Sequence, residues 1–167
     1  CVKDWRQRLE IALAGQAPSF EQWQSLHRLA IVSEFAIDVL VQQPEIIPDL
    51  DNPSSPLSLP EGRESDWPKL IRHWRRAQSV KLIWRDVTGL DSVEQTLAGS
   101  TWIAEQALTA GFDAILASMK KVHGTVRCEQ GAEQFMVILG LGKLGGGELN
   151  FSSDVDLVYA YPQQGES

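Results

Sequence analysis

The first third of the chain repeats apolar residues at helical intervals. Mixed helical spacing predicts a helix over residues 2–13. Ser19 and Gln22 have the spacing of a capping box, in which the side chain of each residue accepts a hydrogen bond from the backbone N–H of the other. The helix that they begin is predicted to continue until Pro44. Residues 48–64 are rich in proline, serine and asparagine, which indicates a loop.

A second helical region follows this loop. Asp66 and Pro68 suit a helix start, since an acidic residue favours the first turn and proline needs no hydrogen-bond acceptor there. Apolar residues at helical spacing then predict a helix over residues 69–86. Gly89 is expected to close this helix, because glycine readily adopts the left-handed conformation that ends one.

The longest predicted helix covers residues 92–121. Asp91 and Glu94 repeat the cap spacing with an acid in both places, so we expect the helix to begin there. Gly99 and Gly111 lie inside it and are expected to loosen it, because glycine weakens a helix interior. A connection of about ten residues is expected to follow this helix.

The pattern changes after this connection. Residues 135–139 form a short run that is apolar on both faces, which is typical of a strand buried in a covered sheet. Residues 140–150 are rich in glycine and predict a turn. Residues 154–161 read as a second strand. The chain is therefore predicted to be α+β and mostly helical, with a helical N-terminal region followed by the first strands of a mixed sheet.

Composition excludes several classes of protein. The chain has 167 residues, of which 43% are apolar and 22% charged, so it lies far from disordered sequences. Its net charge of −7 argues against general nucleic-acid binding, which needs a basic surface. The longest apolar run, residues 135–139, is too short to cross a membrane. We therefore expect neither nucleic acid nor membrane as a partner.

The cysteines and histidines suggest no metal or disulfide site. Cys1 and Cys128 form no CxxC pair, which favours a reducing, cytoplasmic location. His27, His73 and His123 are scattered, and each is expected on a helix surface or in the core. Because the first residue is cysteine rather than methionine, we expect the chain to be a piece of a longer protein.

A cluster of glycines is the first chemical feature of interest. The cluster comes directly after the first predicted strand and consists of Gly140, Gly142, Gly145, Gly146 and Gly147. Glycine allows positive φ and lets backbone N–H groups approach a ligand, and successive N–H groups that turn inward bind anions. Lys143 adds a positive charge. Phosphate is therefore the expected ligand of this turn.

A pair of aspartates is the second feature. Asp154 and Asp156 begin the second predicted strand, so their carboxylates should point to one face, roughly 7 Å apart along the strand. Two carboxylates on one face repel unless a cation lies between them, and Mg²⁺ binds one or two carboxylates together with phosphate oxygens. Val155, Leu157 and Tyr159 should face the other way and can be buried.

Other interpretations of this segment are less favourable. A dinucleotide-binding fingerprint would need a crossover helix, and the second strand begins too soon for one. A Walker A loop needs Ser or Thr after Lys143, and an EF-hand needs a glycine after Asp156. A purely structural alternative is a tight glycine turn capped by Asp154. The combination of lysine, glycines and paired aspartates favours a functional site.

The segment GLGKLGGGELNFSSDVDL, residues 140–157, resembles the signature of glutamine synthetase adenylyltransferase, a bifunctional adenylylating and adenylyl-removing enzyme of the polymerase-beta-like nucleotidyltransferase superfamily. The amino-acid sequence of this motif is more similar to the N-terminal, adenylyl-removing half of that family. Residues 74–86 resemble its arginine-rich helix more loosely. The resemblance divides the chain into a helical region, residues 1–89, and an incomplete N-terminal part of a nucleotidyltransferase domain, residues 90–167.

The resemblance implies a reaction and its partners. Inorganic phosphate would remove AMP from a tyrosine of glutamine synthetase as ADP, and the other half of the enzyme would add AMP from ATP. The signalling protein PII and glutamine would set the balance. Asp154 and Asp156 would be the catalytic residues and would hold Mg²⁺. Contacts to phosphate, or support for the loop that makes them, would come from Gly142, Lys143, Gly145, Gly146 and Ser153.

The resemblance also implies an incomplete site. The superfamily completes its metal site with a third carboxylate from a later strand, which would lie beyond Ser167. We therefore expect these residues alone to bind metal weakly and to be inactive. Two other functions stay open: a nucleotidyltransferase that acts on a different substrate, and a helical interaction segment that adjoins a catalytic domain.

A basic stretch of the second helical region admits three interpretations. Arg72, Arg75 and Arg76, with Lys69 one turn earlier, are predicted to share one helical face. In the simplest interpretation this face is only the solvated side of an amphipathic helix. In the second, it binds an acidic partner or the adenylyl phosphate. Nucleic-acid binding is a third option, which the net charge of −7 disfavours.

Overall fold

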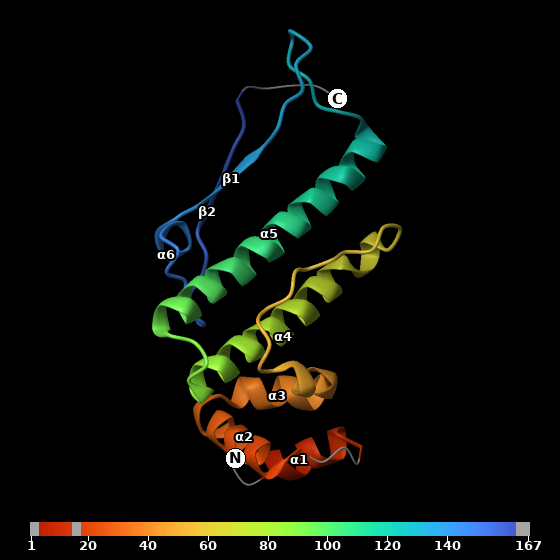
Figure 1. Cartoon of the computed structure of the whole chain (residues 1–167). Helices are drawn as coiled ribbons and strands as arrows, with labels where there is room; N and C mark the ends of the chain where they lie inside the picture. The colour runs from red at the N-terminus through yellow and green to blue at the C-terminus, as the bar shows by residue number, and fades with distance from the viewer. Residues whose placement is uncertain (1–3, 15–17, 163–167) are drawn as a thin grey trace.

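The computed structural model describes residues 4–14 and 18–162 of the chain. Three short helices form one end of the molecule, two long helices rise from them, and a two-stranded sheet runs along the second long helix (Figure 1). The helices are α1 (Trp5–Ala12), α2 (Phe20–Val32), α3 (Glu34–Gln42), α4 (Trp67–Thr88), α5 (Val93–His123) and α6 (Gly142–Gly145). The strands are β1 (Val137–Gly140) and β2 (Leu157–Ala160), and the 3₁₀ turns are η1 (Pro44–Asp49) and η2 (Glu64–Asp66). The predicted α+β, mostly helical fold is confirmed.

The second predicted helix is broken in the structure. Its capping box is present, with the Gln22 backbone N–H donating to Ser19 Oγ at 3.2 Å. At Ser33, however, the backbone becomes extended, and Ser33 Oγ accepts a hydrogen bond from the Ala36 N–H at 3.1 Å. The serine thus begins a new helix, α3, because its side chain competes for the backbone donors of the following turn. The prediction of one continuous helix to Pro44 was wrong.

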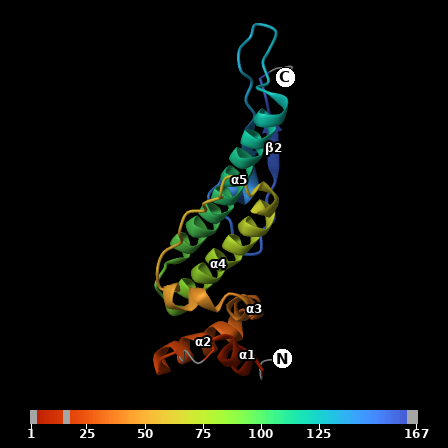
Figure 2. The ribbon, with the colours of Figure 1, turned by 90° about the vertical axis from the view of Figure 1, so that its right-hand side faces the viewer.

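The two long helices begin and end mostly as expected. Helix α4 starts after Asp66 with Pro68 in its first turn, and Gly89 closes it with φ +75°. Helix α5 is capped by Ser92 and Gln95, one residue later than the predicted acidic pair. It also continues unbroken through both of its glycines to His123. The predicted loosening is absent because α5 packs along α4 there, and the two helices lie side by side (Figure 1, Figure 2).

The hydrophobic core lies in the helical end of the molecule. It consists of buried side chains from α1 to α4 and η1, namely Leu9, Leu26, Leu29, Ala36, Ile37, Val39, Leu40, Ile47, Leu50, Val80, Ile83 and Trp84. Polar groups of the connection after η1 reach α4, where Trp84 Nε1 donates to Asp51 Oδ1 at 2.7 Å. No helix in the described part of the chain combines the length and apolar character that a membrane crossing requires.

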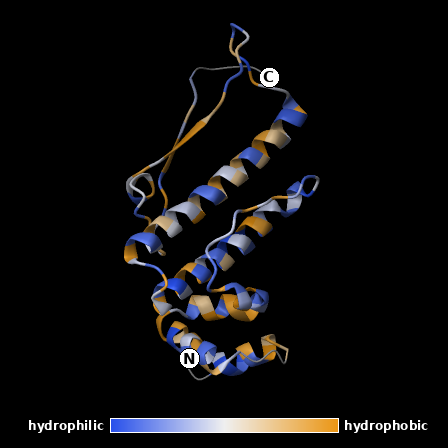
Figure 3. Ribbon diagram, viewed as in Figure 1, coloured by the Kyte–Doolittle hydropathy of each residue, from blue (hydrophilic) through white to orange (hydrophobic). Residues whose placement is uncertain are grey.

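The sheet is antiparallel and largely open to solvent. Val137 pairs with Ala160 and Gly140 with Leu157. Figure 3 shows apolar residues along β1, yet the Leu139 side chain is 48% exposed and that of Tyr159 56%. The prediction of strands buried on both faces was wrong, because only one face of the sheet packs against α5 and no described element covers the other. The antiparallel pairing also excludes the parallel dinucleotide-binding unit.

Candidate functional site

The glycine turn and the aspartate pair meet at one end of the sheet. The ladder continues one residue beyond the paired strands, where the Leu141 N–H donates to the Asp156 carbonyl at 2.9 Å. Helix α6 is a single helical turn directly after Leu141. The chain therefore leaves β1, makes a compact turn and returns beside its starting point, as the sequence predicts.

Helix α5 holds this turn in place. Leu144 and Leu149 are the two leucines of residues 142–150, and both are buried. The Leu149 N–H donates to Thr101 Oγ1 at 3.1 Å, and the same hydroxyl donates to the Leu97 carbonyl at 3.0 Å. Because the buried Thr101 hydroxyl both accepts and donates a hydrogen bond, it fixes the turn to α5. Both leucines point inward, which leaves the backbone between them at the surface.

Two kinds of geometry explain the glycines. A Cβ at Gly145 would lie 2.4 Å from the Gly140 carbonyl oxygen, a separation that side chains do not tolerate. Gly142 and Gly147 have φ of +56° and +72°, which favours glycine. Gly146 has neither constraint, since a Cβ there would meet its nearest atom at 3.5 Å. The turn itself therefore requires glycine at three of these positions but not at Gly146, whose N–H donates to the Gly142 carbonyl at 3.0 Å.

Lys143 and Ser153 are brought together across the turn. Lys143 Nζ donates to Ser153 Oγ at 3.3 Å, and Ser153 Oγ donates to the Asn150 side-chain oxygen. Within residues 4–14 and 18–162, no carboxylate pairs with Lys143. An exposed ammonium group without a counter-ion, held over a turn of exposed backbone, can bind an anion.

Asp154 and Asp156 lie in the extended segment just before β2, not within the strand as predicted. Val155 and Leu157 line two different cavities against α5. Because side chains alternate along extended backbone, we expect both aspartates to face the opposite, open side of the sheet. The predicted burial is wrong, since Val155 and Tyr159 are exposed.

The carboxylates suit a magnesium ion. Both aspartates are exposed, and among the described residues neither carboxylate has a hydrogen-bond or ion-pair partner. Mg²⁺ prefers oxygen ligands and retains several waters, so two open carboxylates beside an anion-binding turn fit it. No group of three or more His, Cys, Asp or Glu side chains in the described part of the chain is arranged to hold a metal. The third carboxylate stays a prediction.

The basic face predicted on α4 is divided in the structure. Arg76 lies over the ring of Phe35, with 5.9 Å from its guanidinium carbon to the ring centroid. Arg72 and Arg75 are both exposed, but Arg75 also lines a cavity together with Asn150 and Ser153 of the turn region. Sequence reasoning grouped these arginines and missed that Arg75 alone reaches the turn. The available signal was its spacing of four residues from Ile71 and Ser79, on the side of α4 that faces α5.

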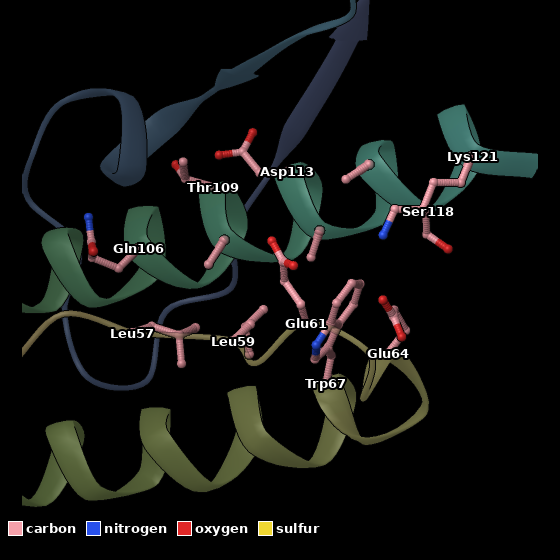
Figure 4. Close-up of a pocket in the computed structure, with 13 residues that line it drawn as sticks. Leu57, Leu59, Glu61, Glu64, Trp67, Gln106, Thr109, Asp113, Ser118 and Lys121 are labelled. Carbon is pink, nitrogen blue, oxygen red and sulfur yellow. The ribbon is translucent and has the colours of Figure 1, made fainter. Parts of the chain in front are cut away.

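A separate groove lies between the N-terminal end of α4 and the C-terminal half of α5 (Figure 4). Its volume is about 430 Å³. Trp67 lies at its edge, and Glu61, Glu64 and Asp113 contribute acidic groups. None of the residues predicted to bind phosphate or metal lines this groove. The candidate site is thus the glycine turn and the aspartate pair.

The architecture defines an α+β protein in which a helical region supports a strand, a glycine turn and a paired-aspartate segment. The model of the glutamate-ammonia ligase adenylyltransferase family matches residues 23–167. The chain belongs to this family.

Individual relatives agree with the family match. The chain is 55% identical over 146 residues to the bifunctional glutamine synthetase adenylyltransferase/adenylyl-removing enzyme of Stenotrophomonas maltophilia (strain R551-3), which covers 85% of the chain and 16% of that relative. It is 48% identical over 166 residues to the enzyme of the same description from Xanthomonas axonopodis pv. citri (strain 306). That match covers 97% of the chain and 17% of the relative. The chain thus spans about one sixth of the length of these curated relatives.

Proposed function

We propose that the chain carries the reaction centre for adenylyl removal in a longer enzyme that controls glutamine synthetase. The carrying observation is the meeting of the glycine turn, Lys143 and two unpaired aspartates at one open sheet end. The names of the relatives support glutamine synthetase as the protein substrate. The resemblance of residues 140–157 to the adenylyl-removing half supports the direction of the reaction and PII as a regulator. The lack of a CxxC pair supports a cytoplasmic location.

The reaction is an in-line displacement at phosphorus. An oxygen of hydrogen phosphate forms a bond to the adenylyl phosphorus as the bond from phosphorus to the tyrosine oxygen breaks, and the phosphate proton ends on that oxygen. The products are ADP and unmodified tyrosine. Such displacements depend on positioning and charge stabilisation. Lys143 and the N–H groups at the start of α6 would orient phosphate oxygens, since the N–H groups of Gly145, Gly146 and Gly147 already donate to carbonyls of the turn. Ser153 would hold the Lys143 ammonium.

Asp154 and Asp156 would hold Mg²⁺ on the open face of the sheet. When bound, the ion would supply Lewis-acid stabilisation of the charge that develops on phosphate oxygens. The aspartates themselves would fix the side from which the adenylyl group approaches, since both are expected to face away from α5. Gly142, Gly145 and Gly146 would keep the approach free of side chains.

Substitution of the aspartates in the full-length enzyme tests this function. Asp154→Asn and Asp156→Asn each remove a charged ligand, and we expect a loss of about 100-fold or more in phosphate-dependent release of ADP from adenylylated glutamine synthetase. ATP-dependent adenylylation should stay within about threefold, because it belongs to the other half. Asp113→Asn, which removes an exposed carboxylate of α5, is the matched control. Retained ADP release in both aspartate variants would refute the proposal, and selective loss of adenylylation would reverse the assigned half.

A further inference from the structure

Arg75 lies on the side of α4 that faces α5, although the residue itself is exposed. One turn before it, Ile71 Cδ1 lies 3.5 Å from the position of a Cβ on Gly111 of α5. Seven residues after it, Leu82 approaches Gly99 of α5 even more closely. Positions four and seven residues apart lie on one helical face, so Arg75 lies within the stripe that joins the two long helices.

A cavity lies between Arg75 and α5. Its α5 wall is mostly apolar and consists of Ser100, Ile103, Ala104, Ala107 and Leu108. The turn region supplies the remaining polar wall with Asn150 and Ser153. The cavity volume is about 190 Å³, below the roughly 300–1,000 Å³ of sites that enclose whole drug-sized ligands. The space therefore suits a single phosphate-sized group better than a complete nucleotide.

Arg75 differs from the paired arginines of the molecule in having no acceptor. Arg85 donates to both carboxylate oxygens of Asp91, at 2.8 and 2.6 Å, and Arg8 donates to Asp38 at 2.7 Å. Among the described residues, no hydrogen bond or ion pair involves the Arg75 guanidinium. A guanidinium group carries five donors in a planar fork that matches phosphate and carboxylate oxygens.

We infer that this cavity is an anion site that binds orthophosphate through the Arg75 fork and the side-chain NH2 group of Asn150. The identity of the anion rests on the proposed function, which consumes inorganic phosphate. The cavity lies on the α5 side of the extended segment, whereas Asp154 and Asp156 are expected to face the other side. Bound orthophosphate thus fixes Asn150, which accepts a hydrogen bond from Ser153, and Arg75 is a positioning residue rather than a catalytic one.

Equilibrium dialysis of the full-length enzyme with radiolabelled orthophosphate, in EDTA and constant ionic strength, tests the site. We expect saturable binding in the wild type and an affinity at least about tenfold weaker in Arg75→Gln, because the charge-assisted fork is lost. Arg72→Gln removes the same charge from an exposed position one turn earlier, and its binding should equal that of the wild type. Equal binding in Arg75→Gln and the wild type would overturn the inference.

Two further variants separate this site from the reaction centre. The double variant Asp154→Asn/Asp156→Asn should lose ADP release yet bind orthophosphate as the wild type does. If that variant keeps its activity while Arg75→Gln loses phosphate binding, the proposed function fails and the anion site stands. Arg75→Lys keeps the charge without the fork, so wild-type affinity in it would overturn the role of the fork. Tighter binding of AMP than of orthophosphate would overturn the assignment to orthophosphate.

Discussion

The two ends of the molecule differ in how far they bury their apolar side chains. The helical end encloses the apolar cluster formed by α1 to α4 and η1. In the segment from residue 124 to residue 162, the buried apolar side chains among the described residues are Cys128, Leu144 and Leu149. The helical end is therefore held by its own core, whereas the sheet end depends on α5 for support and leaves its other face open.

Charges follow the same division. In the helical end, Lys81 pairs with Asp49 at 2.6 Å, and Arg85 forms a two-oxygen contact with Asp91. Near the glycine turn, Lys143 and the two aspartates have no partner of opposite charge among the described residues. Internally paired charges support a fold, whereas charges left unpaired around one turn are available to a ligand. This difference carries the functional assignment.

The largest stability effect should separate the two ends. Leu40 is fully buried in the core, so Leu40→Ala should lower the free energy of unfolding by about 2–5 kcal/mol. Leu139→Ala makes the same truncation on the open sheet face and should cost less than about 1 kcal/mol. Chemical denaturation of the chain, followed by far-UV circular dichroism, measures both. Equal losses would contradict the division into a cored end and an open end.

A smaller effect should come from the ion pair that ties η1 to α4. The Lys81 side chain is 3% exposed and donates to Asp49, whose carboxyl is about half exposed. The hydrogen bond from Asn52 makes the largest contribution to lowering the pKa of Asp49, and the hydrogen bond from Lys81 makes the next largest. Asp49→Asn should therefore cost about 1 kcal/mol at neutral pH, a value reduced for the exposed carboxyl. Unfolding in urea at several pH values measures it.

The pH dependence of this effect has a defined sign. A carboxyl whose folded pKa is lowered stabilises the fold above its unfolded pKa of about 3.9 and loses that contribution as pH falls through the folded pKa. The difference between wild type and Asp49→Asn should thus shrink below about pH 4. Glu10→Gln, at the exposed pair with Arg6, is the control and should cost less than about 0.5 kcal/mol. A difference that stays constant from pH 7 to pH 2 would contradict the role of this pair.

Local sequence signals predicted the helices well because their caps are local. Ser19 with Gln22, Pro68 and Gly89 all act as expected. The break at Ser33 was missed since a serine inside an apolar repeat also suits a continuous helix. The cap at Ser92 was assigned one residue early because Asp91 and Glu94 have equivalent spacing, although Asp91 instead pairs with Arg85.

The parts of the site that depend on residues close in sequence could also be predicted. The turn and its lysine depend on neighbouring residues, so their arrangement could be predicted. The exposure of the sheet and the place of Arg75 depend on how α4 and α5 pack, and that information is distributed over the whole chain. Local patterns of apolar residues, such as residues 135–139, do not reveal whether a second layer covers a strand.

The most direct test is the position of a divalent metal in crystals of the full-length enzyme with bound nucleotide. Mn²⁺ in place of Mg²⁺ gives an anomalous signal that locates the ion without assuming its ligands. The account predicts a peak about 2.0–2.3 Å from carboxylate oxygens of both Asp154 and Asp156, on the sheet face away from α5. A peak at the acidic groove of Glu61, Glu64 and Asp113, with none at the aspartate pair, would contradict it.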